Sequence, residues 1–136
     1  MAGQLPKRRT QAIILFGSPG SGKGTQARLL KEQCVKGPHI STGDMLRHHI
    51  ERQDEIGRQI RDMMKSGLLA PDELVNQLVA DRIKALDCAE GFILDGYPRT
   101  LNQAAVLRRL TDENGIDAAV VHLVVDYERL VARLSG

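Results

Sequence analysis

The residues best suited to chemistry in this 136-residue chain lie in the stretch GSPGSGKGTQ, residues 17–26. Its glycines Gly17, Gly20 and Gly22 let the backbone curve around an anion, so that successive N–H groups point inward and the next helix presents its positive end. Lys23 adds a mobile positive charge for the outer phosphates of a nucleotide. The spacing GxxxxGK after an apolar strand predicts a phosphate-binding loop, and a glycine-rich turn that happens to end in lysine is the alternative.

One glycine departs from the general form of this motif, in which Ser or Thr follows the lysine directly. Gly24 occupies that position, and the hydroxyl suited to magnesium is displaced by one residue to Thr25.

A second polar segment, STGDMLR at residues 41–47, combines groups that suit an acceptor nucleotide. Thr42 can hydrogen-bond a base or cap a helix, and the Arg47 guanidinium can form two hydrogen bonds to a phosphate. Ser41 and Asp44 are also spaced as a capping box, so a purely structural role stays open.

A third polar segment, DGYPRT at residues 95–100, follows the apolar run Phe92–Leu94. Asp95 therefore ends a strand and brings a carboxylate to the ligand edge of a sheet, where it can hold waters around Mg²⁺. A simple turn aspartate is the alternative. Thr100 and Gln103 could equally be only a capping box.

Alternating strands and helices must position these segments. Ala12–Phe16 is a short, β-branched-rich apolar run typical of a strand buried on both faces of a parallel sheet. Phe92–Leu94 and Ala118–Val125 are further apolar runs that predict strands. Helical spacing recurs between them, and over 43–65 it predicts two short helices with a break near Gly57. The sequence predicts an α/β fold with helices on both faces of a parallel sheet. Ligands bind beyond the carboxyl ends of such strands, so the three segments should meet there.

Composition narrows the function classes. Nineteen Lys and Arg against 17 Asp and Glu give a formal charge of +2, so we expect no nucleic-acid or membrane partner. Cys34 and Cys88 fit no metal-ligand spacing, which predicts reduced thiols, and we expect a cytoplasmic protein. The length of 136 residues predicts a single domain. The adjacent His48 and His49 would point about 100° apart on a helix, which predicts solvated surface rather than a shared metal.

The three segments, in this order and spacing, resemble those of the adenylate kinase family of nucleoside monophosphate kinases, in which glycine normally follows the loop lysine. The similarity runs from Ala12 to Gly136. It implies a three-layer P-loop NTPase-type fold with a four-stranded parallel sheet. It also implies transfer of a phosphoryl group from ATP to AMP, giving two ADP, with Mg²⁺ as the cofactor of ATP.

The resemblance implies a role for each matching residue. Lys23, Arg47 and Arg99 would be catalytic, and Asp44 and Asp95 would hold Mg²⁺ through water. ATP would be bound by Gly17, Ser18, Pro19, Gly20, Ser21, Gly22, Lys23, Gly24, Thr25 and Arg133. AMP would be bound by Thr42, Arg47, Gly67, Leu68, Leu69, Ala70, Gly96, Arg99 and Gln103. Thr42 would favour AMP over pyrimidine monophosphates.

The resemblance also carries expectations about the organisation of the chain. Residues 1–136 would be one kinase core with 41–70 as an inserted AMP-binding helical subdomain. Typical members continue into a lid and further elements, which we expect to be absent here, with impaired turnover. The strand at Ala118–Val125 would then lie at a sheet edge and favour self-association. A nucleotide-binding fragment without turnover, or a kinase for another nucleoside monophosphate, are the alternatives.

Overall fold

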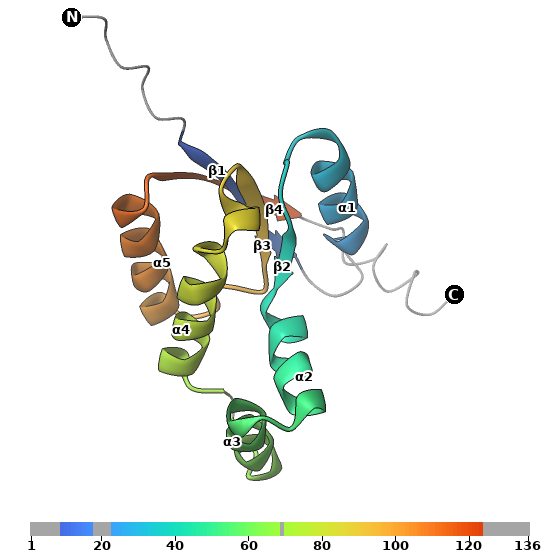
Figure 1. Ribbon diagram of the computed structural model, residues 1–136, viewed down its shortest axis with the longest axis vertical. Coiled ribbons are helices and arrows are strands. Elements are labelled where there is room, and N and C mark those ends of the chain that lie inside the picture. Colours follow the sequence, from blue (N-terminus) through green and yellow to red (C-terminus); the bar gives the residue numbers. More distant parts are fainter. Residues whose placement is uncertain (1–8, 18–22, 69, 124–136) are drawn as a thin grey trace, which may run out of the picture.

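The computed structural model describes residues 9–17, 23–68 and 70–123, which form a parallel sheet with helices on both faces (Figure 1). The elements, in chain order, are β1 (Thr10–Gly17), α1 (Lys23–Gln33), β2 (His39–Ser41), α2 (Thr42–Arg52), α3 (Glu55–Lys65), α4 (Asp72–Ile83), the 3₁₀ turn η1 (Leu86–Cys88), β3 (Gly91–Asp95), α5 (Leu101–Glu113) and β4 (Ile116–Leu123). Among these residues, no helix combines the length and apolar character needed to span a membrane.

The four described strands are parallel and lie in the order β2-β3-β1-β4. Leu15 of β1 pairs with Asp95 of β3, and Ser41 of β2 pairs with the same aspartate. The register therefore brings the carboxyl ends of β1, β2 and β3 to one edge of the sheet. This confirms the predicted α/β class and the number of strands.

Alternate residues of the two central strands, β1 and β3, pack into two hydrophobic cores on opposite faces of the sheet. On one face, Ala12, Ile14, Phe92 and Leu94 pack with α4 and α5. On the opposite face, Leu15 and Ile93 pack with Ala27 of α1. Every residue of β3 is buried, as expected for a strand covered on both faces. Figure 1 shows α1 on one side of the sheet and α4 with α5 on the other.

The helical region after β2 differs in one detail from expectation. The break between α2 and α3 lies at Gln53, which has a left-handed φ of 53°, and at Asp54, which caps α3 by accepting from the Gly57 N–H at 2.8 Å. Gly57 lies inside α3 and is buried. A Cβ there would stand 1.9 Å from the His49 carbonyl oxygen. The glycine permits close packing of α3 on α2 rather than a break.

Candidate active site

The carboxyl edge of the sheet carries an ion pair between two predicted site residues. Lys23 begins α1, and its Nζ lies 2.8 Å from Oδ1 of Asp95, the last residue of β3. The Asp95 side chain is only 10% exposed. The structure thus places the cation of the phosphate-binding motif directly against the carboxylate predicted to hold magnesium waters.

Asp95 has a second partner that sequence reasoning missed. Its Oδ2 lies 3.0 Å from Nε2 of His39, the first residue of β2. His39 pairs with Ile93 in the sheet, two residues before Asp95, so the histidine and the aspartate share a face. The available signal was the alternation of His39 with Ser41 in a strand leading into the STGDMLR segment, but that strand has only three residues.

Thr42 connects the start of α2 to the loop after β3. Its side chain is buried at 5% exposure, and its hydroxyl donates to the Gly96 carbonyl at 3.0 Å. Gly96 has a φ of 85°, and a Cβ there would lie 2.8 Å from the Thr42 hydroxyl oxygen. Only glycine suits this position, because both the backbone conformation and the space exclude a side chain.

Arg99 shares a hollow with Lys23. Its Nε donates to the Gly96 carbonyl at 2.9 Å. A cavity of about 260 Å³ is lined by Leu15, Phe16, Gly17, Lys23, Gly96, Pro98 and Arg99. Two cations from different elements therefore border one space at the edge where ligands of parallel α/β sheets bind.

Two further charged residues of the prediction, Arg47 and Asp44, lie on α2. The Arg47 guanidinium bonds the Asp44 carboxylate, and both side chains are exposed, at 66% and 62%. The Asp44 N–H donates to Ser41 Oγ at 3.3 Å, so the capping alternative for this segment is present in the structure. Neither charged side chain lines the hollow shared by Lys23 and Arg99.

Gln103 is buried in the first turn of α5. Its N–H donates to Thr100 Oγ1 at 3.1 Å, which confirms the capping interpretation. Its side chain does not return to Thr100 but accepts from the Arg99 N–H through Oε1 at 2.7 Å and donates through Nε2 to Asp72 Oδ1 at 3.0 Å. Asp72 was not among the predicted site residues.

The other predicted site residues that the structure describes follow α3 or lie in the first turn of α1. Gly67, with a φ of 78°, follows α3, and Leu68 is 60% exposed, while Ala70 packs against the core. Gly24 and Thr25 are exposed in the first turn of α1. Seven predicted site residues lie outside the described part of the chain: Ser18, Pro19, Gly20, Ser21, Gly22, Leu69 and Arg133.

Asp95 supplies one carboxylate of the kind that a magnesium site uses. Its Oδ1 is buried and receives no hydrogen bond of good geometry in the described structure, although Lys23 Nζ is close enough for an ion pair. No group of three or more His, Cys, Asp or Glu side chains that could hold a metal ion occurs among the described residues.

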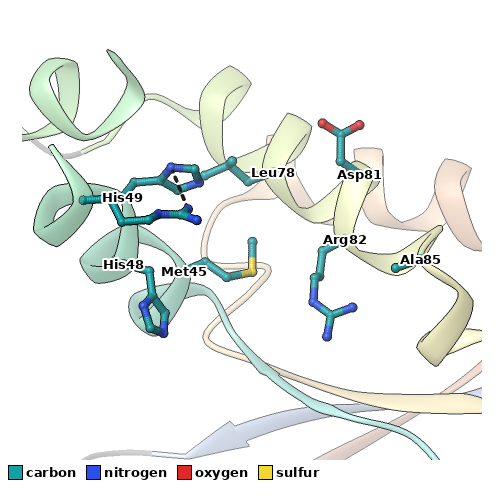
Figure 2. Close-up of a pocket in the computed structure, with 8 residues that line it drawn as sticks. Met45, His48, His49, Leu78, Asp81, Arg82 and Ala85 are labelled. Carbon is teal, nitrogen blue, oxygen red and sulfur yellow. Dashed lines mark hydrogen bonds between the residues drawn. The ribbon is translucent and has the colours of Figure 1, made fainter. Parts of the chain in front are cut away.

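A second hollow, of about 510 Å³, lies between α2 and α4 (Figure 2). It is lined by Met45, His48, His49, Arg52, Leu78, Asp81, Arg82 and Ala85, none of which was predicted as a site residue. His48 is exposed, as expected. His49 is not simply solvated, because its Nδ1 lies 2.6 Å from Asp54 Oδ2.

The parallel sheet, with a lysine after β1 and a carboxylate at the end of β3, defines a nucleotide-binding protein of the P-loop class. The family model for adenylate kinase matches residues 15–136. The chain belongs to the adenylate kinase family.

Several curated adenylate kinases are similar to the chain over most of its length. That of Bartonella bacilliformis is 51% identical over 124 residues, which cover 90% of this chain and 64% of the relative. That of Rhizobium meliloti is 50% identical over 125 residues, covering 91% and 65%. That of Fervidobacterium nodosum is 49% identical over 125 residues, covering 90% and 56%. The chain thus spans less than two thirds of the length of these relatives.

Proposed function

We propose that this chain catalyses reversible, magnesium-dependent transfer of the terminal phosphoryl group of ATP to AMP, giving two ADP. The observation that carries the proposal is the cavity bordered by both Lys23 and Arg99, with Asp95 in contact with the lysine. Phosphoryl transfer depends mainly on positioning and on neutralising charge, and these residues provide both at one edge.

On the donor side, residues 17–25 would bind the ATP phosphates through backbone N–H groups and through Lys23. In this structure the lysine is paired with Asp95. A bound phosphate would therefore compete with the carboxylate for the same ammonium group. Arg133, by family resemblance, would contact the adenine of ATP.

On the acceptor side, residues 41–70 would form the AMP-binding subdomain. Thr42, Gln103 and the backbone of 67–70 would contact the nucleoside, while Arg47 and Arg99 would contact its phosphate. The attacking phosphate oxygen is already anionic, so no protein base is needed. Arg99, which borders the cavity, is well placed to neutralise the transferred group.

Magnesium bound with ATP would neutralise charge on the outer phosphates. Asp95, with its buried Oδ1, is the first residue that we propose to hold its waters, and Asp44 is the second. For Asp44 to take part, its carboxylate would have to leave Arg47, with which it is paired in this structure.

The test is ADP formation by the purified chain from ATP and AMP, measured in a coupled assay. Lys23→Met should lower the rate by roughly 10²- to 10³-fold, because a charge that stabilises the transition state is lost. Lys31→Met, on the same helix and exposed, is the matched control and should keep the wild-type rate. Equal rates for the two variants would contradict the proposal.

Two further measurements separate the alternatives. ATP binding in a calorimeter beside a silent assay would identify a nucleotide-binding protein without turnover. Faster turnover with UMP, CMP or dTMP than with AMP would identify a different acceptor.

We also infer a cytoplasmic setting and a tendency to self-associate. Both described cysteines are free thiols, Cys34 exposed and Cys88 buried, which supports a reducing compartment. Within the described residues β4 pairs with β1 and forms an edge of the sheet, where Val120 is 66% exposed. An exposed apolar edge strand supports pairing with a second copy.

A further inference from the structure

Asp72, in the first turn of α4, uses both carboxylate oxygens on the start of α5. Oδ1 accepts from Gln103 Nε2 at 3.0 Å, and Oδ2 accepts from Thr100 Oγ1 at 3.0 Å. The same threonine hydroxyl caps α5 by accepting the Gln103 N–H. One acidic side chain thus connects two helices that are far apart in the sequence, at the point where the loop after β3 enters α5.

These bonds fix which way the Gln103 amide faces. A carboxylate can only accept hydrogen bonds and a backbone N–H can only donate. Asp72 therefore requires Nε2 on its side, and the Arg99 N–H, at 2.7 Å from Oε1, requires the oxygen on the other. Turning the amide by 180° would set Nε2 against an N–H and Oε1 against a carboxylate, so both contacts would become repulsive.

The locked amide has hydrogen-bonding groups that its two partners do not use. A primary amide carries two N–H donors and two acceptor positions, and Asp72 and Arg99 take one of each. One donor and one acceptor remain, in a fixed order. Adenine presents an acceptor at N1 beside the N6 donor, whereas guanine presents a donor at N1 beside the O6 acceptor. An amide of fixed orientation matches one of these edges and opposes the other, if the rest of the nucleotide is held in place.

A neighbouring contact strengthens the connection between α4 and this loop. Tyr97, only 1% exposed, donates its hydroxyl hydrogen to Asn76 Oδ1 at 2.6 Å, one turn along α4 from Asp72. Burial, and secondarily the charge of Asp72, raises the pKa of Tyr97 to about 12. The Asp72 carboxylate is therefore held at a set place relative to the loop that carries Arg99.

We propose that Asp72 is a positioning residue for acceptor selection: its carboxylate locks the Gln103 amide in the orientation that favours adenine over guanine. The proposal rests on the proposed function, in which Gln103 contacts the acceptor base. Asp72 itself does not touch the nucleotide. It acts through Gln103, and by the same bonds it holds the Arg99 backbone.

The experiment compares binding of AMP and GMP to the full chain by calorimetry. Asp72→Asn keeps the shape of the side chain but can present either an oxygen or an NH₂ to Gln103, so a turned amide loses only one of its two good contacts. We expect the preference for AMP over GMP to fall by about tenfold, which corresponds to about 1.4 kcal/mol, because a matched two-bond contact to the base is weakened. The ratio compares two ligands on one protein, so a loss of folded protein cancels.

Glu73→Gln is the matched control, because it removes the same charge from the same helical turn at an exposed position. It should leave the ratio unchanged. If Asp72→Asn weakens AMP and GMP by the same factor, or changes neither, the proposal is overturned and Asp72 is structural only.

A second measurement tests whether the Gln103 amide is held in place, without any nucleotide. In ¹⁵N-labelled protein, hydrogen exchange of the Gln103 side-chain NH₂ should be faster in Asp72→Asn than in the wild type and the Glu73→Gln control. Equal exchange in all three overturns the lock alone. A wild-type chain that binds neither AMP nor GMP overturns the proposed function, and the selectivity proposal with it.

Discussion

Lys23 Nζ lies 2.8 Å from Asp95 Oδ1, so the carboxylate at the end of β3 forms an ion pair with the cation proposed to bind phosphate. His39 contacts the other oxygen of the same carboxylate. The charge available to an incoming nucleotide therefore depends on what holds Asp95.

Asp95→Asn should separate the pairing of Asp95 with Lys23 from its proposed role in holding magnesium waters. Without a carboxylate partner, Lys23 is freed for phosphate, so ATP should bind more tightly in the absence of Mg²⁺. Turnover with Mg²⁺ should fall by roughly 10²-fold, because the proposed holder of the magnesium waters is lost. Calorimetry with and without Mg²⁺ and the coupled assay measure the two effects. Asp112→Asn, exposed on α5, should change neither, and weaker ATP binding by Asp95→Asn without Mg²⁺ would contradict the argument.

Gly57→Ala should destabilise the protein by about 1–3 kcal/mol, because the added Cβ has no room against the His49 carbonyl and this backbone contact yields little. Urea unfolding monitored by circular dichroism measures the change. Gly43→Ala, in the first turn of α2, is the comparison, since its Cβ would meet only the flexible Arg47 side chain at 3.4 Å. Equal stability of the two variants would show that α3 can shift away from α2.

Asp54 should make the folded protein sensitive to acid. The Gly57 N–H, and next the His49 side chain, hold the pKa of Asp54 below its ordinary value of 3.8. A depressed pKa in the folded state adds stability above the unfolded value, and that stability is lost as the pH falls through the folded value. Asp54→Asn should therefore flatten the dependence of unfolding free energy on pH below about 4. Asp62→Asn, exposed on α3, should keep the wild-type slope.

Val120→Lys should reduce self-association, because a charge on an exposed edge strand discourages pairing with another strand. Sedimentation velocity over a range of concentrations compares this variant with the wild type. Ala105→Lys adds the same charge at an exposed position on α5 and should sediment like the wild type. A wild type that stays monomeric at the highest concentration would contradict the proposed edge pairing.

The sequence was most informative where the signal is local. The apolar runs Ala12–Phe16 and Phe92–Leu94 each form a strand, and Asp95 ends the second as predicted, because continuous burial on both faces leaves a pattern in adjacent residues. The capping roles of Ser41 and Thr100 were also readable from spacing over a single turn.

Contacts that depend on tertiary packing could not be predicted from the sequence. His39 reaches Asp95 only because of the β2–β3 register, and a strand of three residues leaves no periodic pattern. The partner of the Gln103 side chain is Asp72, which requires α4 to lie beside α5. Glycine favours helix ends, so Gly57 in the sequence predicts a break. The close approach of two helices also selects glycine but has no local signature.

The register of the central strand bears on the order of events during synthesis. β1 leaves the ribosome first, yet Gln11 pairs with Gly91, and Thr10 pairs with Ile116. Such distant pairings form slowly, because the entropy cost of closing a long loop comes before the stabilising contacts form. A nascent chain that ends before residue 91 would contain the glycine-rich loop without the sheet that orients it. We therefore expect the nucleotide-binding site to form late in synthesis. Until β3 and β4 have been made, the apolar strand β1 has no paired strand on either side.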